Sequence, residues 1–350
     1  MEHFDVNPMG LDGFAFCEFT SPDGDALARQ FEQLGFVAAA THPDKDVTLY
    51  RQGRINLLLN RESAGQAADF RAAHGPSANA MAFRVADATA AFDDAIVRGA
   101  TAAEASTSAF PKTKVLEGIG GSLLYLVDGD PFADWEEVAG WREEAAKNGV
   151  GLDLLDHLTH NVRRGQMRHW AEFYGRIFGF EEQKYFDIKG KATGLFSQAM
   201  IAPDKAIRIP LNESQDDKSQ IEEFIRDYNG EGIQHLALTT DDIYETVERL
   251  RARGVKLQDT IETYYELVDK RVPGHGEDLA RLKKNRILID GDVKEEGILL
   301  QIFTENMVGP IFFEIIQRKG NEGFGNGNFQ ALYESIELDQ IRRGVITVDA

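Results

Sequence analysis

Two histidines and one glutamate lie in three separate short apolar runs and are of residue types that bind transition metals. His157 lies in LLDHLTHNV, His235 in GIQHLALTT and Glu314 in IFFEIIQ. Two imidazoles and one carboxylate that project from three strands toward one point can hold a divalent iron on one face and leave the opposite positions open for a substrate and O2. The sequence therefore predicts a catalytic metal site at these residues.

The chain contains the same unit twice. Leu11–Phe16 (LDGFAF) matches Leu155–His160 (LDHLTH), and Met81–Asp87 (MAFRVAD) matches Leu236–Asp242 (LALTTDD). The period of about 150 residues is far longer than the repeat of a solenoid, so it indicates two similar domains. We expect equal helix lengths between the first matched strand and the Gly-Phe pair that follows it in each copy.

We place the domain boundary in the polar, glycine-ended stretch Ala145–Gly151, which gives domains at 1–150 and 151–350. The candidate ligands fall opposite residues that cannot bind a metal in the first copy: His157 opposite Gly13, His235 opposite Ala80 and Glu314 opposite Leu126. A histidine that only filled the core would not usually have a glycine or an alanine as its counterpart, as His157 and His235 do. The second domain is therefore expected to be the catalytic one.

Each candidate ligand has a structural alternative. His157 and His235 could be satisfied core histidines, and Glu314 could form a buried salt bridge, because an ionised carboxylate among Phe and Ile residues is costly to bury unless it is paired or bound to a metal. His160 stands three residues after His157, so in a strand it points to the opposite face and is expected to be structural. A zinc site is a further alternative, although the sequence has no HExxH motif of the protease type.

The spacing of apolar residues predicts the helices and strands. Leucine and aromatic residues recur at i, i+4 and i+7 in three segments, which predicts helices with one buried face: Leu27, Phe31 and Leu34; Trp170, Tyr174 and Ile177; Ile243, Val247 and Leu250. Alternating or continuous apolar runs predict strands at Phe14–Phe19, Ala80–Val85, Ser122–Val127, His157–Val162, Gln234–Thr239, Ile298–Phe303 and Ile311–Ile316. The fold class is α+β, with a strand, helix, strands pattern that occurs twice in each half.

Composition excludes several classes of function. The formal net charge of −20 repels polyphosphate, so nucleic acid and anionic membranes are not expected as partners. The chain has one cysteine, Cys17, and therefore no intrachain disulfide, and its start lacks the features of a signal peptide. No apolar stretch approaches the roughly 18 residues that span a bilayer. We therefore expect a soluble, cytoplasmic protein.

The sequence resembles the 4-hydroxyphenylpyruvate dioxygenase family of the vicinal oxygen chelate superfamily. The motifs DHLTHNV, PLNES, KSQIEEF, GIQHLAL, LLQIFTEN, IFFEIIQR and GFGNGNF stand in the family's order, and the match covers essentially the whole chain. The resemblance implies two domains, each made of paired βαβββ modules whose strands curve into an open barrel. It also implies an Fe(II) cofactor and a homo-oligomer, a dimer or tetramer, formed through the first domain.

The family's substrate contacts carry over where this sequence matches. The resemblance assigns substrate binding to Ser197, Asn212, Gln220, Gln234, Gln301, Phe303, Phe324 and Phe329. Amides and a serine suit a phenol, because a site that hydrogen-bonds a hydroxyl rejects the analogue that lacks it. Gln234 is a strand neighbour of His235 and is expected to point to the other face of the strand. Gln301 and Phe303 are two residues apart and should share a face.

The C-terminal GFGNGNF run has three glycines and two asparagines, which suits a flexible hinge, and FQALYESIELDQIRR follows it as an expected helix. In the family this helix gates the pocket, and Phe324 and Phe329 stack around the substrate ring. Tyr333 departs from the phenylalanine that many relatives have there. Closing the helix over the site would exclude water from the reaction.

The resemblance implies a reaction in which 4-hydroxyphenylpyruvate and O2 give homogentisate and CO2 in tyrosine and phenylalanine breakdown, through oxidative decarboxylation, ring hydroxylation and side-chain migration. Three alternatives stay open. A 4-hydroxymandelate synthase shares fold, metal and substrate but hydroxylates the benzylic carbon. An extradiol catechol dioxygenase would need a base histidine near the metal. A non-catalytic glyoxalase-fold protein would bind a small ligand without iron.

Overall fold

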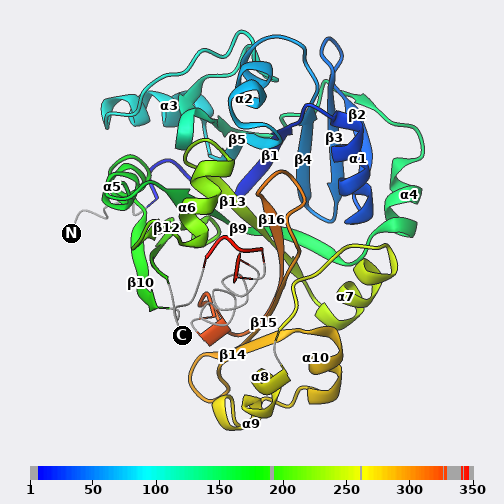
Figure 1. Cartoon of the computed structure of the whole chain (residues 1–350). Helices are drawn as coiled ribbons and strands as arrows, with labels where there is room; N and C mark the ends of the chain where they lie inside the picture. Colours follow the sequence, from blue (N-terminus) through cyan, green and yellow to red (C-terminus); the bar gives the residue numbers. More distant parts are fainter. Residues whose placement is uncertain are drawn as a thin grey trace, which may run out of the picture.

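Two eight-stranded sheets, one from each half of the chain, dominate the computed structural model (Figure 1). The structure describes residues 7–189, 193–260, 262–325, 327–328, 340–341 and 343–346. The first sheet has the order β6-β7-β5-β1-β4-β3-β2-β8, and the second has the order β10-β11-β12-β9-β13-β16-β15-β14. In each sheet, one parallel and one antiparallel neighbour flank the strand at the centre.

The elements of the first half follow the expected module pattern. Its strands are β1 (Phe14–Thr20), β2 (Val37–Thr41), β3 (Val47–Gln52), β4 (Ile55–Asn60), β5 (Ser77–Arg84), β6 (Val115–Glu117), β7 (Leu123–Val127) and β8 (Glu136–Glu137). Its helices are α1 (Gly24–Gln33), α2 (Gln66–His74), α3 (Ala88–Val97), the 3-10 turn η1 (Ile119–Gly121) and α4 (Trp141–Asn148). The second module is one strand short, and an isolated bridge between Ala102 and Leu116 lies where that strand would be.

The second half contains both modules in full. Its strands are β9 (Leu152–Val162), β10 (Glu181–Lys189), β11 (Gly194–Ile201), β12 (Arg208–Ser214), β13 (Gly232–Thr240), β14 (Leu288–Asp292), β15 (Gly297–Phe303) and β16 (Phe312–Lys319). Its helices are α5 (Met167–Phe178), α6 (Gln220–Asp227), α7 (Ile243–Ala252), α8 (Glu262–Glu266), α9 (Val268–Arg271) and α10 (Leu279–Asn285). Helices α8 to α10 form an excursion between α7 and β14, at the bottom of Figure 1. The expected glyoxalase-type α+β fold is confirmed.

Local chemistry explains where several helices begin and end. Asp87 and Asp242 cap α3 and α7, and each side chain accepts a hydrogen bond from a backbone N–H in the first helical turn. Gly179 ends α5 with a φ of +75°, a left-handed conformation that a residue with a Cβ adopts only at a cost. The three apolar helix faces expected from the sequence are buried, which confirms those helices.

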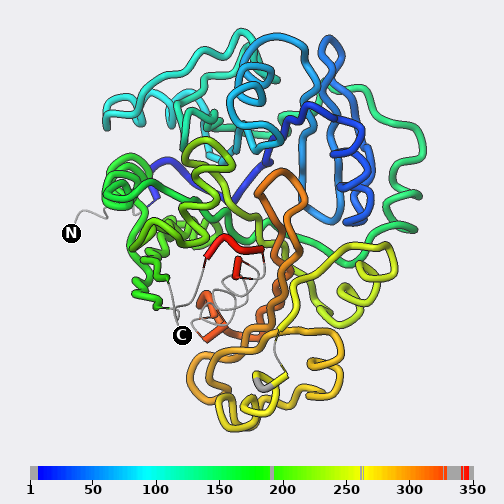
Figure 2. Tube along the Cα trace, in the orientation of Figure 1, coloured from blue at the N-terminus to red at the C-terminus, as the bar shows by residue number. Residues whose placement is uncertain are grey.

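The two halves share one core. The largest apolar cluster contains side chains of both, and the Phe83 ring packs against Phe178 with centroids 5.4 Å apart. The blue-to-cyan tube of the first half lies directly on the green-to-orange tube of the second in Figure 2. The chain crosses between sheets from α4 to β9, and the domain limits at 150 and 151 remain a prediction. Within the described part of the chain, no helix has the length and apolar character needed to cross a membrane.

Candidate metal centre and substrate pocket

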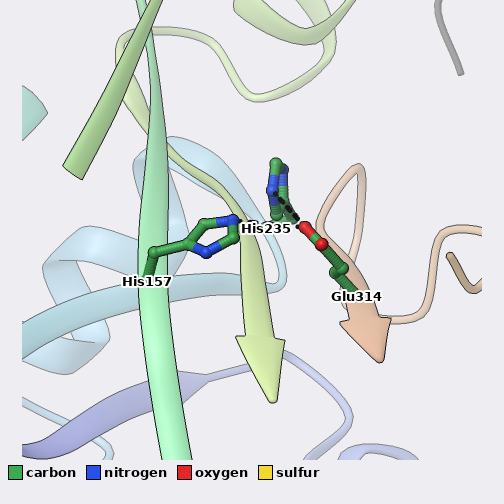
Figure 3. A group of neighbouring side chains, drawn as sticks. All are labelled: His157, His235 and Glu314. Carbon is green, nitrogen blue, oxygen red and sulfur yellow. Dashed lines mark ion pairs between the residues drawn. The ribbon is translucent and has the colours of Figure 1, made fainter. Parts of the chain in front are cut away.

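Three neighbouring strands bring His157, His235 and Glu314 together (Figure 3). In the ladders of β13 with β9 and β16, Ala237 lies opposite both His157 and Glu314, and His235 stands two residues before it, so all three project from the same face. His157 Nε2 is 3.2 Å and His235 Nε2 is 3.4 Å from Glu314 Oε2. One donor atom from each residue lies within 4.8 Å of the others, and all three side chains are buried.

Each of these side chains has a hydrogen-bond partner behind it. The contacts are His157 Nδ1 to Asp156 Oδ2 at 2.8 Å, His235 Nδ1 to Gln234 Oε1 at 3.0 Å, and Gln301 Nε2 to Glu314 Oε1 at 2.6 Å. Because each Nδ1 faces an acceptor, the neutral form of each imidazole favours the tautomer that carries its proton on Nδ1 and directs the Nε2 lone pair to the shared centre. This arrangement fixes the tautomer and orientation that a metal ligand needs.

The three buried side chains of the triad influence one another's pKa values. Burial alone would lower the pKa of His157, but the facing Glu314 carboxylate and Asp156 raise it above the usual range. Burial lowers the pKa of His235. Burial would also raise the pKa of Glu314, but the two imidazoles outweigh this and hold it at about 2. The carboxylate is therefore ionised at neutral pH and requires positive charge beside it.

The donor set fits a divalent metal ion. Two imidazole nitrogens and one carboxylate oxygen are the ligands of a facial iron triad, and they also suit zinc. Without a metal ion, the positive charge that the buried Glu314 carboxylate requires would have to come from a proton on His157, whose pKa the neighbouring carboxylates raise. Thr159 Oγ1, 3.0 Å from His235 Nε2, adds a hydroxyl beside the same centre.

Gln234 does not point away from the site as the strand alternation predicts. In the ladder of β13 with β9, Ile233 pairs with His160 and His235 pairs with Thr159, so Gln234 is an extra, bulged residue. A bulge places two residues of one strand opposite one of the other and redirects a side chain. The Gln234 amide oxygen thereby accepts a hydrogen bond from His235 Nδ1, and the expectation of an opposite face is wrong.

A row of polar side chains lines the sheet beside the triad. Ser197 lies opposite Asn212, and Asn212 lies opposite Asn161 in adjoining ladders, all of them buried. Asn212 Nδ2 is 3.5 Å from Gln234 Oε1. Among the residues that the structure describes, Ser197 Oγ, Asn212 Oδ1 and both amide atoms of Asn161 have no hydrogen-bond partner. Gln220, also buried, begins α6.

Two aromatic residues assigned to the pocket by resemblance stand at the histidines. The Phe324 ring lies 5.4 Å from the His157 ring, edge to face, and the Phe303 ring lies 6.4 Å from the His235 ring. Phe324 and Phe303 are both buried. Phe329 and most of the expected C-terminal helix, including Tyr333, lie outside the described residues. The gating role of that helix therefore stays a prediction.

His160 has a different environment from His157. Its Nε2 is 2.7 Å from the hydroxyl of Tyr174 in α5, on the core side of the sheet, and burial lowers its pKa to about 3. His160 is thus a neutral core residue. Among the described residues, the group that could hold a metal is His157, His235 and Glu314, without His42, His74, His169 or His275.

The strand registers show which residues of the first sheet occupy the positions of the three proposed ligands. Two of these residues differ from those expected from the sequence. With Asp87 and Asp242 matched as caps, Ala80 does correspond to His235, as expected. The ladders then place three residues at the ligand positions: Phe16 for His157 instead of Gly13, Ala80 for His235, and Tyr125 for Glu314 instead of Leu126. The Phe16 and Tyr125 rings, 5.6 Å apart, belong to an apolar cluster inside the first sheet.

The expectation of equal helix lengths explains the error. Helix α1 has 10 residues and α5 has 12. Asn161 to Gly179 spans 18 positions, whereas the corresponding Thr20 to Gly35 spans 15, so the second copy is three residues longer before its Gly-Phe pair. The Gly-Phe pairs match, but the strands before them are offset.

Sequence reasoning missed several residues of the site. Asp156 could have been found as the carboxylate adjacent to a ligand histidine, and Asn161 as the residue four positions after His157 on the same strand face. Arg318 donates to Asp156 through Nε and Nη2, at 2.9 and 2.8 Å. It is separated from Asp156 by 162 residues and gave no signal in the sequence pattern.

Comparison with known families and proteins agrees with this architecture. The profile of "Hydroxyphenylpyruvate dioxygenase, HPPD, N-terminal" matches residues 4–137, and that of the "Glyoxalase/Bleomycin resistance protein/Dioxygenase superfamily" matches residues 154–267. A mutant of 4-hydroxymandelate synthase from Streptomyces coelicolor has a similar structure, with a TM-score of 0.83 and 28% identity over 95% of this chain and 100% of that one.

Two relatives are similar over nearly their full length. The 4-hydroxyphenylpyruvate dioxygenase of Pseudomonas aeruginosa is 57% identical, with 97% of each chain covered. The 4-hydroxyphenylpyruvate dioxygenase of Legionella pneumophila (strain Corby) is 53% identical, with 97% of this chain and 98% of that protein covered. At this identity and coverage, the chain belongs to the 4-hydroxyphenylpyruvate dioxygenase family.

Proposed function

We propose that this protein is an iron(II)-dependent dioxygenase that converts 4-hydroxyphenylpyruvate and O2 into homogentisate and CO2. The observation that carries the proposal is the convergence of His157 Nε2, His235 Nε2 and Glu314 Oε2 in a buried space, on a sheet with polar side chains that find no partner within the described part of the chain. The names of the Pseudomonas and Legionella relatives support the substrate and the reaction. His157, His235 and Glu314 are the proposed iron ligands.

Iron(II) held by these three side chains would supply open coordination positions for a keto acid and the redox chemistry of O2. The chain's own side chains bind and orient the substrate. Ser197 Oγ and Asn212 Oδ1 are buried and have no hydrogen-bond partner among the described residues, and the hydroxyl of a phenol would satisfy them. Gln220 at the start of α6 is proposed to contact the same ring.

The remaining proposed contacts surround the triad. Gln234 and Gln301 each hold a ligand side chain, and their amides also border the space that the keto acid would occupy. Phe303 and Phe324 provide apolar walls that would pack on the substrate ring and exclude water. Phe329 is proposed to do the same, by resemblance alone.

The wider assignments are also proposals. We infer a non-catalytic domain at 1–150, a catalytic domain at 151–350, a place in tyrosine and phenylalanine catabolism, a cytoplasmic location and a homo-oligomer. The net charge of −20 supports the absence of nucleic-acid or membrane partners. The similarity to the catalytic family argues against a ligand-binding protein without iron.

Oxygen uptake with product chromatography tests the function. Protein loaded with Fe(II) should consume O2, release CO2 and form homogentisate from 4-hydroxyphenylpyruvate, whereas Glu314→Ala should not. Glu182→Ala, which removes an exposed carboxylate on β10, is the matched control and should behave as the unmodified protein. The likeness to 4-hydroxymandelate synthase makes that product the principal alternative, and its appearance in place of homogentisate would refute the proposed reaction.

A further inference from the structure

The Asp156 carboxylate, next to the proposed ligand His157, accepts three hydrogen bonds and forms ion pairs with two arginines. Oδ2 accepts from His157 Nδ1 and from Arg318 Nη2, both at 2.8 Å. Oδ1 accepts from Arg318 Nε at 2.9 Å and lies 3.6 Å from Arg208 Nη1. Asp156 is therefore fixed in position by two arginines, and through Oδ2 it fixes the His157 ring.

The same Arg318 guanidinium also holds the backbone that follows β16. Its Nη1 donates to the carbonyl oxygen of Asn321 at 3.0 Å and to that of Gly323 at 2.6 Å. Its planar fork is pre-organised for several partners at once, so one side chain contacts the carboxylate and the backbone segment together. The arginine is only 13% exposed, so loss of either set of partners would leave buried donors unsatisfied.

A second arginine and an aromatic ring reinforce this connection. Arg208 forms an ion pair with Glu322, between the two carbonyls that Arg318 binds. The Phe324 ring, which follows directly, lies 5.4 Å from the His157 ring and 6.0 Å from the Arg318 guanidinium. Residues 321–324 thus contact the ligand histidine directly through Phe324 and indirectly through the two arginines and Asp156.

A similar contact reaches the third ligand. Asn328 Nδ2 donates to Gln301 Oε1 at 3.0 Å, and Gln301 Nε2 donates to Glu314 Oε1. Gly325 has a φ of +66°, and a Cβ there would collide with the Gln301 amide, so the backbone passes close to this residue. The chain after β16 is therefore joined to the orienting partners of both His157 and Glu314.

We propose that Arg318 is a positioning residue that couples metal binding to the packing of residues 321–324. A metal ion at His157 Nε2 strengthens the Nδ1–H···Asp156 hydrogen bond and holds the carboxylate where Arg318 can bind both it and the two carbonyls. By linkage, packing of the segment stabilises the metal-binding orientation of His157 to the same degree. The inference rests on the metal site of the proposed function.

Hydrogen exchange of the full chain, with and without cobalt(II) chloride, tests the coupling without turnover. In the unmodified protein, cobalt should slow amide exchange in residues 321–324 by about fivefold or more, within the usual range of site-to-site coupling. Arg318→Met should lose most of this response and bind cobalt about 10- to 100-fold more weakly in a visible-absorption titration. Because the variant binds cobalt more weakly, amide exchange in the two proteins is compared at cobalt concentrations that saturate both.

Two further variants complete the test. Arg318→Lys keeps the charge but not the fork, and should respond less than the unmodified protein while remaining folded. Arg281→Met removes a bidentate pair with Glu248 far from the metal and should keep the full response. The inference is overturned if cobalt binds but does not slow exchange in the unmodified protein, or if Arg318→Met responds equally. Failure of the unmodified protein to bind cobalt would instead refute the metal site itself.

Discussion

Gln301 Nε2 donates a hydrogen bond of 2.6 Å to Glu314 Oε1, so that only Oε2 of this carboxylate faces the two histidines. The amide therefore selects the oxygen that is available to a metal ion. Gln301 contacts the proposed ligand Glu314 directly, so it orients the ligand set as well as being a proposed substrate contact.

Gln301→Leu should weaken cobalt binding by about 10- to 100-fold, because the carboxylate loses the partner that orients it. A titration of the metal-free protein followed by visible absorption measures this. Gln198→Leu is the control, since it removes an amide–carboxylate contact with Glu182 on the outer strands. Equal affinity in Gln301→Leu and Gln198→Leu would show that the Gln301 hydrogen bond does not orient the ligand.

Asn161→Ala should lower discrimination between 4-hydroxyphenylpyruvate and phenylpyruvate. Both amide atoms of Asn161 are buried without partners among the described residues, and the residue lies opposite Asn212. Loss of a hydrogen-bonding group near the substrate hydroxyl should reduce kcat/KM for 4-hydroxyphenylpyruvate by about 10- to 100-fold and change that for phenylpyruvate less. Steady-state kinetics with both keto acids measures the ratio. Asn229→Ala, at an exposed contact with Ala73, should leave the ratio unchanged.

His160→Gln should reduce the loss of stability in mild acid. The pKa of the buried His160 is about 3, so the folded protein keeps it neutral while the unfolded chain takes up a proton below about pH 6.5. Stability from this group is present above pH 6.5 and is lost as the pH falls toward 3, by about 1.4 kcal/mol per unit.

Urea denaturation of the metal-free protein at pH 7 and pH 5 measures this effect. The drop in unfolding free energy between the two should be about 2 kcal/mol smaller in His160→Gln than in the unmodified protein. His169→Gln, at an exposed position on α5, is the control. An identical pH dependence in His160→Gln would mean that His160 is protonated in the folded protein.

Phe83→Ala should destabilise both halves together. The Phe83 ring is fully buried and packs against Phe178 and Phe180 of the second half, with centroids at 5.4 and 6.1 Å. Removal of such a ring costs about 3–5 kcal/mol. Calorimetry should show one transition at a lower temperature. A new early transition confined to the first half would contradict the shared core.

Sequence reasoning succeeded where a residue type or a period carried the information. His157, His235 and Glu314 were recognisable as a group because their chemistry is unusual for apolar strands and because the repeat lacks them. It failed where inserted residues change the geometry. The bulge at Gln234 reverses the side that alternation assigns, and three extra residues shift the first matched strand.

Long-range polar contacts were equally inaccessible. The pairing of Asp156 with Arg318 joins strands on either side of β13, and no local pattern encodes it. The lack of a partner for the Asn161 amide among the residues that the structure describes becomes visible only when its neighbours are known. Residues that orient a site are thus harder to predict than residues that perform its chemistry.

The aromatic filling of the first sheet limits how many reaction centres one chain can have. In the first sheet, the aromatic rings of Phe16 and Tyr125 fill the positions that His157 and Glu314 have in the second sheet. Reintroducing nitrogen and oxygen ligands there would not suffice, because the surrounding rings would also have to be removed to admit a substrate. Elemental analysis of the metal-loaded protein should therefore find a single metal ion per polypeptide, although the chain contains two similar domains.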